Sequence, residues 1–273
     1  MRTHILITIL FLILFPGSFL KGKNVDAELI TNIKSIQPGK EFWVAIKLTA
    51  KQDWHTYWRN PGDSGLPTTI EWDLPEGFKH SEIYWTYPEM FIVEGIANFG
   101  YEKEELLLIK ITPPKNLQTN KTVTLKAKAG WLACRVECVP EGEDLSLTLP
   151  VKNEKPEIDN AINKKIEAAI NKLPAINSDL KLSAEQKETL VVISCTGNFD
   201  KLKNVRFFPY EAGYYSHSAE QKLIQKENRF TLQIPLDDFK IGNPENVTGI
   251  LFFENGLKNK QQKSIEINLK LIN

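Results

Sequence analysis

Short runs in which apolar and polar residues alternate recur along most of the chain. Residues 122–129 place Val123, Leu125 and Ala127 on one face of an extended segment, and residues 265–271 alternate in the same way. Turn-forming stretches rich in Pro, Gly, Asn and Asp separate many of the runs. The other β-rich runs cover residues 42–48, 68–72, 106–111, 145–149, 190–195, 205–208, 230–234 and 250–253. Many short strands at such spacing predict a β-sandwich or barrel.

A helical period is clear in one stretch, where apolar residues recur every three or four positions. Asp159 or Asn160 can cap the start of this helix, and Pro174 ends it. The residues of its single apolar stripe are Ile158, Ala161, Ile162, Ile166, Ala169, Ile170 and Leu173.

The helix divides the β runs into two groups. The polar stretch 151–157, which contains Pro156, reads as a linker before it. We therefore predict a mostly β chain, in which residues 28–150 form an immunoglobulin-like β-sandwich. Residues 158–273 are expected to form a second, smaller β domain that the helix introduces.

The N-terminus carries the pattern of an export signal. Ile5 to Phe15 is an uninterrupted apolar run that follows Arg2. It is shorter than the roughly 20 apolar residues that a membrane span needs, but it fits the apolar region of a signal peptide. We expect a signal peptide over residues 1–22, with cleavage as late as residue 27; an uncleaved anchor is the alternative. No later stretch is apolar enough to cross a bilayer, so the mature chain is expected to be soluble in an oxidising compartment.

Composition excludes several classes of function. The chain has 273 residues, enough for one large or two ordinary domains. Its 34 Lys and Arg residues balance 34 Asp and Glu residues, and no dense basic run is present. We therefore expect no nucleic-acid partner and no attraction to anionic membranes. No nucleophilic triad, phosphate-binding loop or paired-carboxylate motif occurs in the sequence either.

The most promising chemistry lies in two close cysteines. Three residues separate Cys134 from Cys138, so a tight turn or one helical turn can bring them together. A disulfide that closes so short a loop stabilises a fold by only about 2 kcal/mol, less than half of what a hundred-residue loop gives. The pair is thus a poor structural cross-link, which favours a redox-active disulfide.

Two other interpretations of the pair remain open: a local staple and a metal site. Zinc usually needs four ligands, and His55, His80, His217 and Cys195 lack ligand-like spacing. Copper(I) can accept two thiolates, so copper handling stays an alternative. Our prediction is no metal site and no cofactor. Cys195 lies within an apolar run and is expected to be buried as a small hydrophobic residue.

Several motifs, in order along the chain, resemble one family. The stretch from His55 to Pro67, HTYWRNPGDSGLP, resembles a signature of the N-terminal periplasmic region of DsbD-type thiol:disulfide interchange proteins. It is most similar to the branch that contains the suppressor of copper sensitivity protein ScsB. Residues 85–88, 95–102 and 131–141 agree with the same family. The resemblance covers residues 28–150 well, and residues 158–273 resemble the second β domain of that branch more weakly.

The resemblance implies a function and roles for individual residues. The family's immunoglobulin-like domain receives electrons from a thioredoxin-like domain of a DsbD-type membrane electron donor. It passes them to periplasmic disulfide oxidoreductase clients, in processes that include cytochrome c biogenesis and copper tolerance. The family's second cysteine forms the mixed disulfides, which corresponds to Cys138, and Cys134 would be the resolving partner. An aromatic residue of a cap loop shields the pair, and Phe99, with Tyr101 nearby, is the best match for this cap or partner-binding role.

Two departures from the family limit the comparison. The gap between the cysteines is shorter here, and the sequence has no counterpart of the family's membrane and C-terminal thioredoxin-like domains. We therefore expect a periplasmic protein-disulfide reductase component that a separate partner reduces. The alternatives are a non-catalytic binding protein of two β domains with a structural disulfide, and a copper(I)-handling accessory protein.

Overall fold

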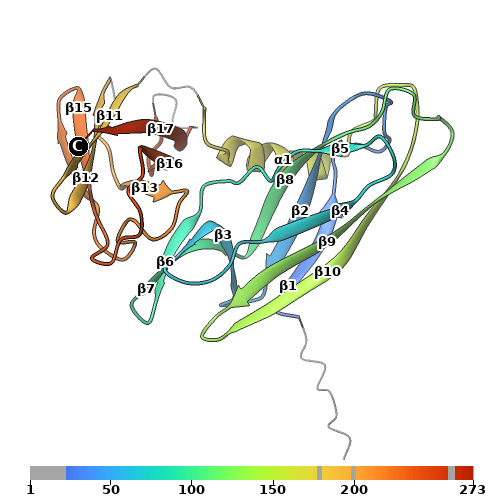
Figure 1. Cartoon of the computed structure of the whole chain (residues 1–273). Helices are drawn as coiled ribbons and strands as arrows, with labels where there is room; N and C mark the ends of the chain where they lie inside the picture. The colour runs from blue at the N-terminus through green and yellow to red at the C-terminus, as the bar shows by residue number, and fades with distance from the viewer. Residues whose placement is uncertain (1–22, 177–179, 198–200, 258–261, 273) are drawn as a thin grey trace, which may run out of the picture.

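The computed structural model describes residues 23–176, 180–197, 201–257 and 262–272 (Figure 1). The predicted signal peptide, residues 1–22, lies outside the described residues. The first strand, β1, already begins at Val25, whose side chain is buried. Cleavage after Ala27 would therefore remove half of a strand that the fold uses. No helix in the described ranges is long and apolar enough to cross a membrane.

The first domain is a sandwich of two antiparallel sheets, as the sequence predicts. One sheet has the order β1 (Val25–Ile30), β2 (Phe42–Ala50), β8 (Glu104–Thr112) and β5 (Lys79–His80). The other has the order β10 (Cys138–Pro150), β9 (Thr122–Cys134), β3 (His55–Gly62), β7 (Ile96–Glu102) and β6 (Glu89–Val93), and β4 (Thr69–Asp73) also pairs with β9.

Strand β8 reads as an uninterrupted apolar run because both of its faces are buried. Leu107 and Ile109 point into the core between the two sheets. Leu106 and Leu108 point the other way, where they pack against Ile166 of the helix α1 (Asn160–Lys172). A strand that is buried on both faces does not show the alternation of apolar and polar residues that is typical of a half-exposed strand.

The helix belongs by its packing to the first domain. Asp159 caps its start, since the side-chain Oδ1 accepts hydrogen bonds from the backbone N–H groups of Ala161 and Ile162 at 2.9 and 3.1 Å. The segment predicted as a linker is also fixed to this domain: Lys152 N–H donates to the carbonyl of Ile36, and Lys34 N–H donates to that of Glu157. The division between the packed units therefore falls after the helix, later than the sequence suggests.

The second domain is built on one curled seven-stranded sheet (Figure 1). All of its neighbouring strands are antiparallel except β17 and β11, which are parallel. Cys195 is fully buried on β12, as expected, and burial raises the pKa of its thiol to about 12. The strand order is β13 (Val205–Pro209), β16 (Asn246–Phe253), β17 (Ser264–Ile272), β11 (Lys181–Lys187), β12 (Leu190–Thr196), β15 (Arg229–Pro235) and β14 (Lys222–Lys226).

The two domains share buried side chains. Phe208 and Ile250 of the second domain belong to the same apolar cluster as the core of the first sandwich. The ring of Phe208 lies 5.1 Å from that of Phe99 on β7 and 6.2 Å from that of Trp58 on β3, centroid to centroid. The second domain is therefore packed directly against strands β3 and β7 of the first.

This shared core predicts a large effect for one side chain of the second domain. Phe208→Ala should lower the free energy of unfolding by about 3–5 kcal/mol, because it leaves a cavity between the domains. The matched control is Phe239→Ala, since Phe239 is 90% exposed and should contribute little. Denaturant unfolding followed by tryptophan fluorescence measures both, and equal midpoints for the two variants would contradict the shared core.

Candidate functional site

The two close cysteines form a disulfide at the end of a hairpin. Cys134 is the last residue of β9 and Cys138 is the first of β10, and the two are directly opposite in the strand register. Their Cα atoms lie 4.1 Å apart, and their sulfurs are bonded. The intervening loop is held by a hydrogen bond from the N–H of Arg135 to the carbonyl of Glu137, at 3.3 Å. A hairpin thus supplies the bend that the spacing requires.

The two cysteines differ sharply in exposure. Cys134 is 2% exposed, because it is covered where β9 meets β3. Cys138 is exposed, and so are the three residues of the loop before it, of which Val136 is 75% exposed. An approaching molecule therefore meets the Cys138 side of the disulfide first.

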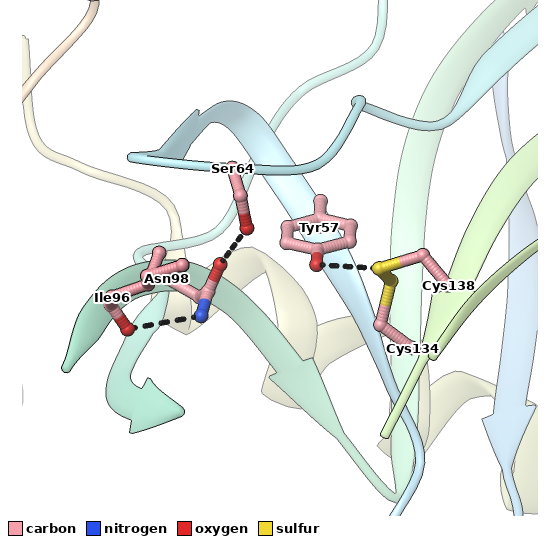
Figure 2. The surroundings of a disulfide bond; sticks show 6 residues. All are labelled: Tyr57, Ser64, Ile96, Asn98, Cys134 and Cys138. Carbon is pink, nitrogen blue, oxygen red and sulfur yellow. Dashed lines mark hydrogen bonds between the residues drawn. A yellow bond between two sulfur atoms is a disulfide. The ribbon is translucent and has the colours of Figure 1, made fainter. Parts of the chain in front are cut away.

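A small cavity of about 90 Å³ lies beside the disulfide. Tyr57 borders it, and its hydroxyl donates a hydrogen bond to the sulfur of Cys138 at 3.5 Å (Figure 2). Ser64 and Asn98 also line the cavity, joined by a hydrogen bond of 2.8 Å. Burial raises the pKa of Tyr57, which keeps its hydroxyl protonated and able to donate.

Gly65 explains how the aromatic ring of Tyr57 reaches the disulfide. Gly65 has a φ of +98°, and a Cβ atom placed on it would lie 2.3 Å from the ring of Tyr57. Any other residue would push the ring away and would also strain the backbone. The glycine of the sequence DSGLP is therefore required by the close approach of Tyr57.

The tip of the β6–β7 hairpin forms the other side of the cavity. Glu94 and Gly95 make its two-residue turn, with φ values of 52° and 85°. Positive φ at both turn positions is the pattern that suits the twist of a hairpin. Val93, Glu94 and Ile96 line the cavity, so this tip lies against the disulfide.

The structure places both residues predicted for the cap in the protein core. Phe99 is 1% exposed, and its ring contacts Phe208 and His217 of the second domain. Tyr101 is also buried, and its hydroxyl donates to the carbonyl of Thr86 at 3.0 Å.

Neither of these two residues lines the cavity beside the disulfide. The rings that line the cavity are those of Tyr57 and His55, and Phe91 packs against His55 with ring centroids 4.4 Å apart. The apolar run before Glu94-Gly95 is a hairpin signal that would have identified the tip.

His55 is a site residue that the sequence pattern does not identify. It is only 4% exposed, and it lies directly opposite Cys134 in the pairing of β3 with β9. Burial lowers the pKa of its imidazole from 6.5 to about 4, so the ring is neutral at physiological pH. The ring nitrogen Nε2 is buried and has no hydrogen-bond partner. His55 and Tyr57 are two positions apart on β3, so their side chains lie on the same face of the sheet. This spacing is the sequence signal that could have identified His55 as a site residue.

The polar residues of the motif after β3 connect the site to the second domain. The carboxylate of Asp63 accepts hydrogen bonds from Nδ1 of His217 and from the backbone N–H of Ala97, each at 2.9 Å. The side-chain amide of Asn60 donates to the carbonyls of Pro209 and Glu211. Because Ala97 follows Ile96 at the hairpin tip, the second domain helps to fix the wall of the cavity.

The described residues contain no cluster of three or more His, Cys, Asp or Glu side chains able to hold a metal ion. Two polar side chains that line the cavity are uncharged: Tyr57, whose hydroxyl donates to Cys138, and His55, whose imidazole is neutral. What this arrangement offers chemically is a disulfide with one accessible and one protected sulfur.

Comparison with known proteins agrees with the motifs. The family model for the N-terminal region of thiol:disulfide interchange protein DsbD matches residues 25–150. No curated protein sequence matches the chain. The crystal structure of the N-terminal periplasmic domain of ScsB from Proteus mirabilis matches with a TM-score of 0.65 and 16% sequence identity, over 93% of this chain and 96% of that one. This likeness confirms the predicted fold, an immunoglobulin-like sandwich followed by a second β domain.

Two pilin structures have a much weaker likeness. The C-terminal fragment of the major pilin GBS80 of Streptococcus agalactiae has a TM-score of 0.28 and 8% identity, over 91% of this chain and 92% of that one. The major pilin subunit BcpA of Bacillus cereus has a TM-score of 0.26 and 9% identity, over 91% of this chain and 67% of that one. Scores this low carry no argument about the present chain.

The neutral, buried His55 predicts a specific dependence of stability on pH. The unfolded chain binds a proton at this residue below about pH 6.5, whereas the folded chain does so only below about pH 4. Folding stability should therefore fall as the pH drops through this window, by about 2–3 kcal/mol. Denaturant unfolding at both ends of the window should show this loss, and His55→Phe should remove it.

The control for this prediction is His80→Phe, because His80 is exposed on β5. Comparing each variant with the parent chain cancels the contributions of the carboxylates. An unchanged pH dependence in His55→Phe would show that the imidazole is not kept neutral by burial.

Proposed function

We propose that this chain is an exported, periplasmic thiol:disulfide interchange component, because the family model for the N-terminal region of thiol:disulfide interchange protein DsbD matches residues 25–150. It passes reducing equivalents to client proteins through the Cys134 and Cys138 pair, without an organic cofactor. The observation that carries the proposal is the hairpin-end disulfide, which has Cys138 exposed and Cys134 buried.

The pair is loaded with electrons by a thioredoxin-like domain of a DsbD-type membrane electron donor. A donor thiolate attacks Sγ of Cys138, the bond between the two cysteines breaks, and the electron pair goes to Sγ of Cys134. The second donor thiolate then attacks the donor sulfur of this mixed disulfide and releases Cys138. Two electrons have moved, the donor has become a disulfide, and the pair is reduced.

Delivery to the client, a periplasmic disulfide oxidoreductase, runs through the same two sulfurs. The thiolate of Cys138 attacks the client's disulfide and forms a mixed disulfide, while one client sulfur leaves with the electron pair. Cys134 then attacks Cys138, and the second client sulfur leaves. The second attack is intramolecular between residues that are direct cross-strand partners, so it needs little rearrangement.

The surroundings of Cys138 support its role as the attacking sulfur. Val136 and Ile96 border the disulfide and are 75% and 43% exposed, so a docked partner would cover apolar surface there. The guanidinium of Arg135 lies 5.6 Å from the ring centroid of Trp54, close to the hairpin end. Arg135 favours the thiolate form of a neighbouring cysteine, whereas Glu137, which directly precedes Cys138, opposes it.

Trapping of mixed disulfides tests the proposal. In the Cys134→Ala variant, Cys138 can attack a client but nothing resolves the product. Covalent adducts that dithiothreitol releases should therefore accumulate in the native envelope, about tenfold above those of the parent chain. Non-reducing electrophoresis measures the adducts, and mass spectrometry identifies the partners.

The matched control is Cys138→Ala, which retains only the buried sulfur of the pair and should form few adducts. Equal adduct levels in the two variants would count against an attacking role for Cys138. A structural staple would give no adducts and an oxidised form that resists mild reductant. A copper(I) protein would instead bind the metal stoichiometrically when reduced and lose it on Cys138→Ser.

A further inference from the structure

The unpartnered nitrogen of His55 requires an explanation. Buried polar atoms in proteins nearly always have a hydrogen-bond partner, and one that has none marks strain or a functional site. Nε2 of His55 is buried without a partner. The rings of Tyr57 and Phe91 pack against the imidazole, with centroids at 5.2 and 4.4 Å. An aromatic residue would fill this space without the cost of a lost hydrogen bond.

The strand register places His55 directly opposite Cys134. His55 and Cys134 are direct partners in the antiparallel pairing of β3 with β9, so their side chains project from the same face of the sheet. The Cβ atoms of such partners lie about 4.5–5.5 Å apart. Both residues also line the 90 Å³ cavity beside the disulfide. The imidazole and the sulfur of Cys134 therefore lie on the same face of the sheet and border one cavity.

The site then holds one polar group for each sulfur. Tyr57, two residues along β3, already donates to Cys138. The sulfur of Cys134 carries neither a proton nor a charge in the disulfide, so it is only a weak acceptor in that state. Opening of the disulfide changes this, because Cys134 then becomes a buried thiolate or thiol.

We propose that His55 is a catalytic residue that hydrogen-bonds the sulfur of Cys134 whenever the disulfide is open. This inference rests on the proposed function of the pair. When a partner thiolate bonds to Cys138, the bond between the cysteines breaks and its electron pair moves to Cys134. The ring N–H of neutral His55 donates to the resulting thiolate, and no proton is transferred in this step. The same hydrogen bond keeps Cys134 available as the thiolate that later resolves the client.

The charged groups near His55 in the described part of the chain do not form an ion pair with its imidazole, so the ring acts as a neutral hydrogen-bond donor. Glu102 faces His55 from β7 in the strand register, and it is exposed. Glu94 and Arg135 border the same cavity and carry opposite charges. The low pKa of His55 arises from burial, which supports a neutral donor at physiological pH.

Reduction by dithiothreitol tests the role of His55 in the full-length oxidised chain. His55→Phe keeps an aromatic ring against Phe91 and Tyr57 but has no hydrogen-bond donor. The rate constant of reduction, followed by tryptophan fluorescence, should fall about tenfold or more, the effect of losing a hydrogen bond to a charged group. His55→Gln restores an N–H donor and should regain most of the rate. His80→Phe is the control and should react like the parent chain.

Acidity of the thiol gives a second readout that a purely structural role would not change. In a Cys138→Ser, Cys195→Ala background, Cys134 is the remaining cysteine, and its ultraviolet thiolate absorbance gives its pKa. Adding His55→Phe should lower the acid dissociation constant of Cys134 about tenfold. An unchanged reduction rate in His55→Phe, or an unchanged thiol pKa of Cys134, would overturn the proposal.

The unsubstituted protein provides a test that does not depend on how a variant folds. With ¹⁵N-labelled histidine, the NMR chemical shift of Nε2 of His55 should change on reduction of the disulfide. The chemical shift of Nε2 of His80 should stay the same. An unchanged chemical shift for His55 would overturn the proposal. Dithiothreitol reduces the disulfide without a biological partner, so this experiment tests the role of His55 separately from the proposed function of the chain. Absent envelope adducts would count against the proposed function, whereas a normal dithiothreitol rate in His55→Phe would count against His55 alone.

Discussion

The direct pairing of Cys134 with Cys138 across the β9–β10 hairpin is the constraint on which the site depends. A three-residue loop leaves the two residues opposite each other, close enough to bond. β9 is an interior strand, and at its end Cys134 lies beside β3, whereas β10 is an edge strand with Cys138 at its exposed start. The same geometry that closes the disulfide therefore makes its two sulfurs unequal.

The second domain contributes to the site without reaching the disulfide. Phe208 fills part of the first domain's core behind β3 and β7. His217 and Asp63 continue this contact in polar form, and Asp63 in turn binds the backbone at Ala97, beside the hairpin tip. The strand that carries Tyr57 and the hairpin that faces it are thus both held from one side. Packing of this kind holds the reacting groups in fixed positions while the disulfide opens and closes repeatedly.

Sequence patterns could predict the strands, the helix and the close approach of the two cysteines, because each depends on residues close in the chain. They could not predict which surface the helix covers, because the apolar stripe of a helix does not identify the surface on which it packs. In the structure the stripe packs on β8. Motif position suggested Phe99 as the cap, but its burial depends on Phe208, which is remote in sequence. His55 was missed for the same reason, because only the pairing of β3 with β9 brings it to Cys134.

Uncharged side chains beside the disulfide, those of His55 and Tyr57, avoid a loss of stability that a buried charged side chain would cause. A buried cation beside Cys134 would stabilise its thiolate, but it would be left unpaired in the disulfide state, and an unpaired buried charge is strongly destabilising. A neutral imidazole and a neutral hydroxyl cost far less in that state, because only a hydrogen bond is left unmade. Burial keeps both groups uncharged, since it lowers the pKa of His55 and raises that of Tyr57. Neutral donors can therefore serve a disulfide that has to be stable in both its bonded and its open form.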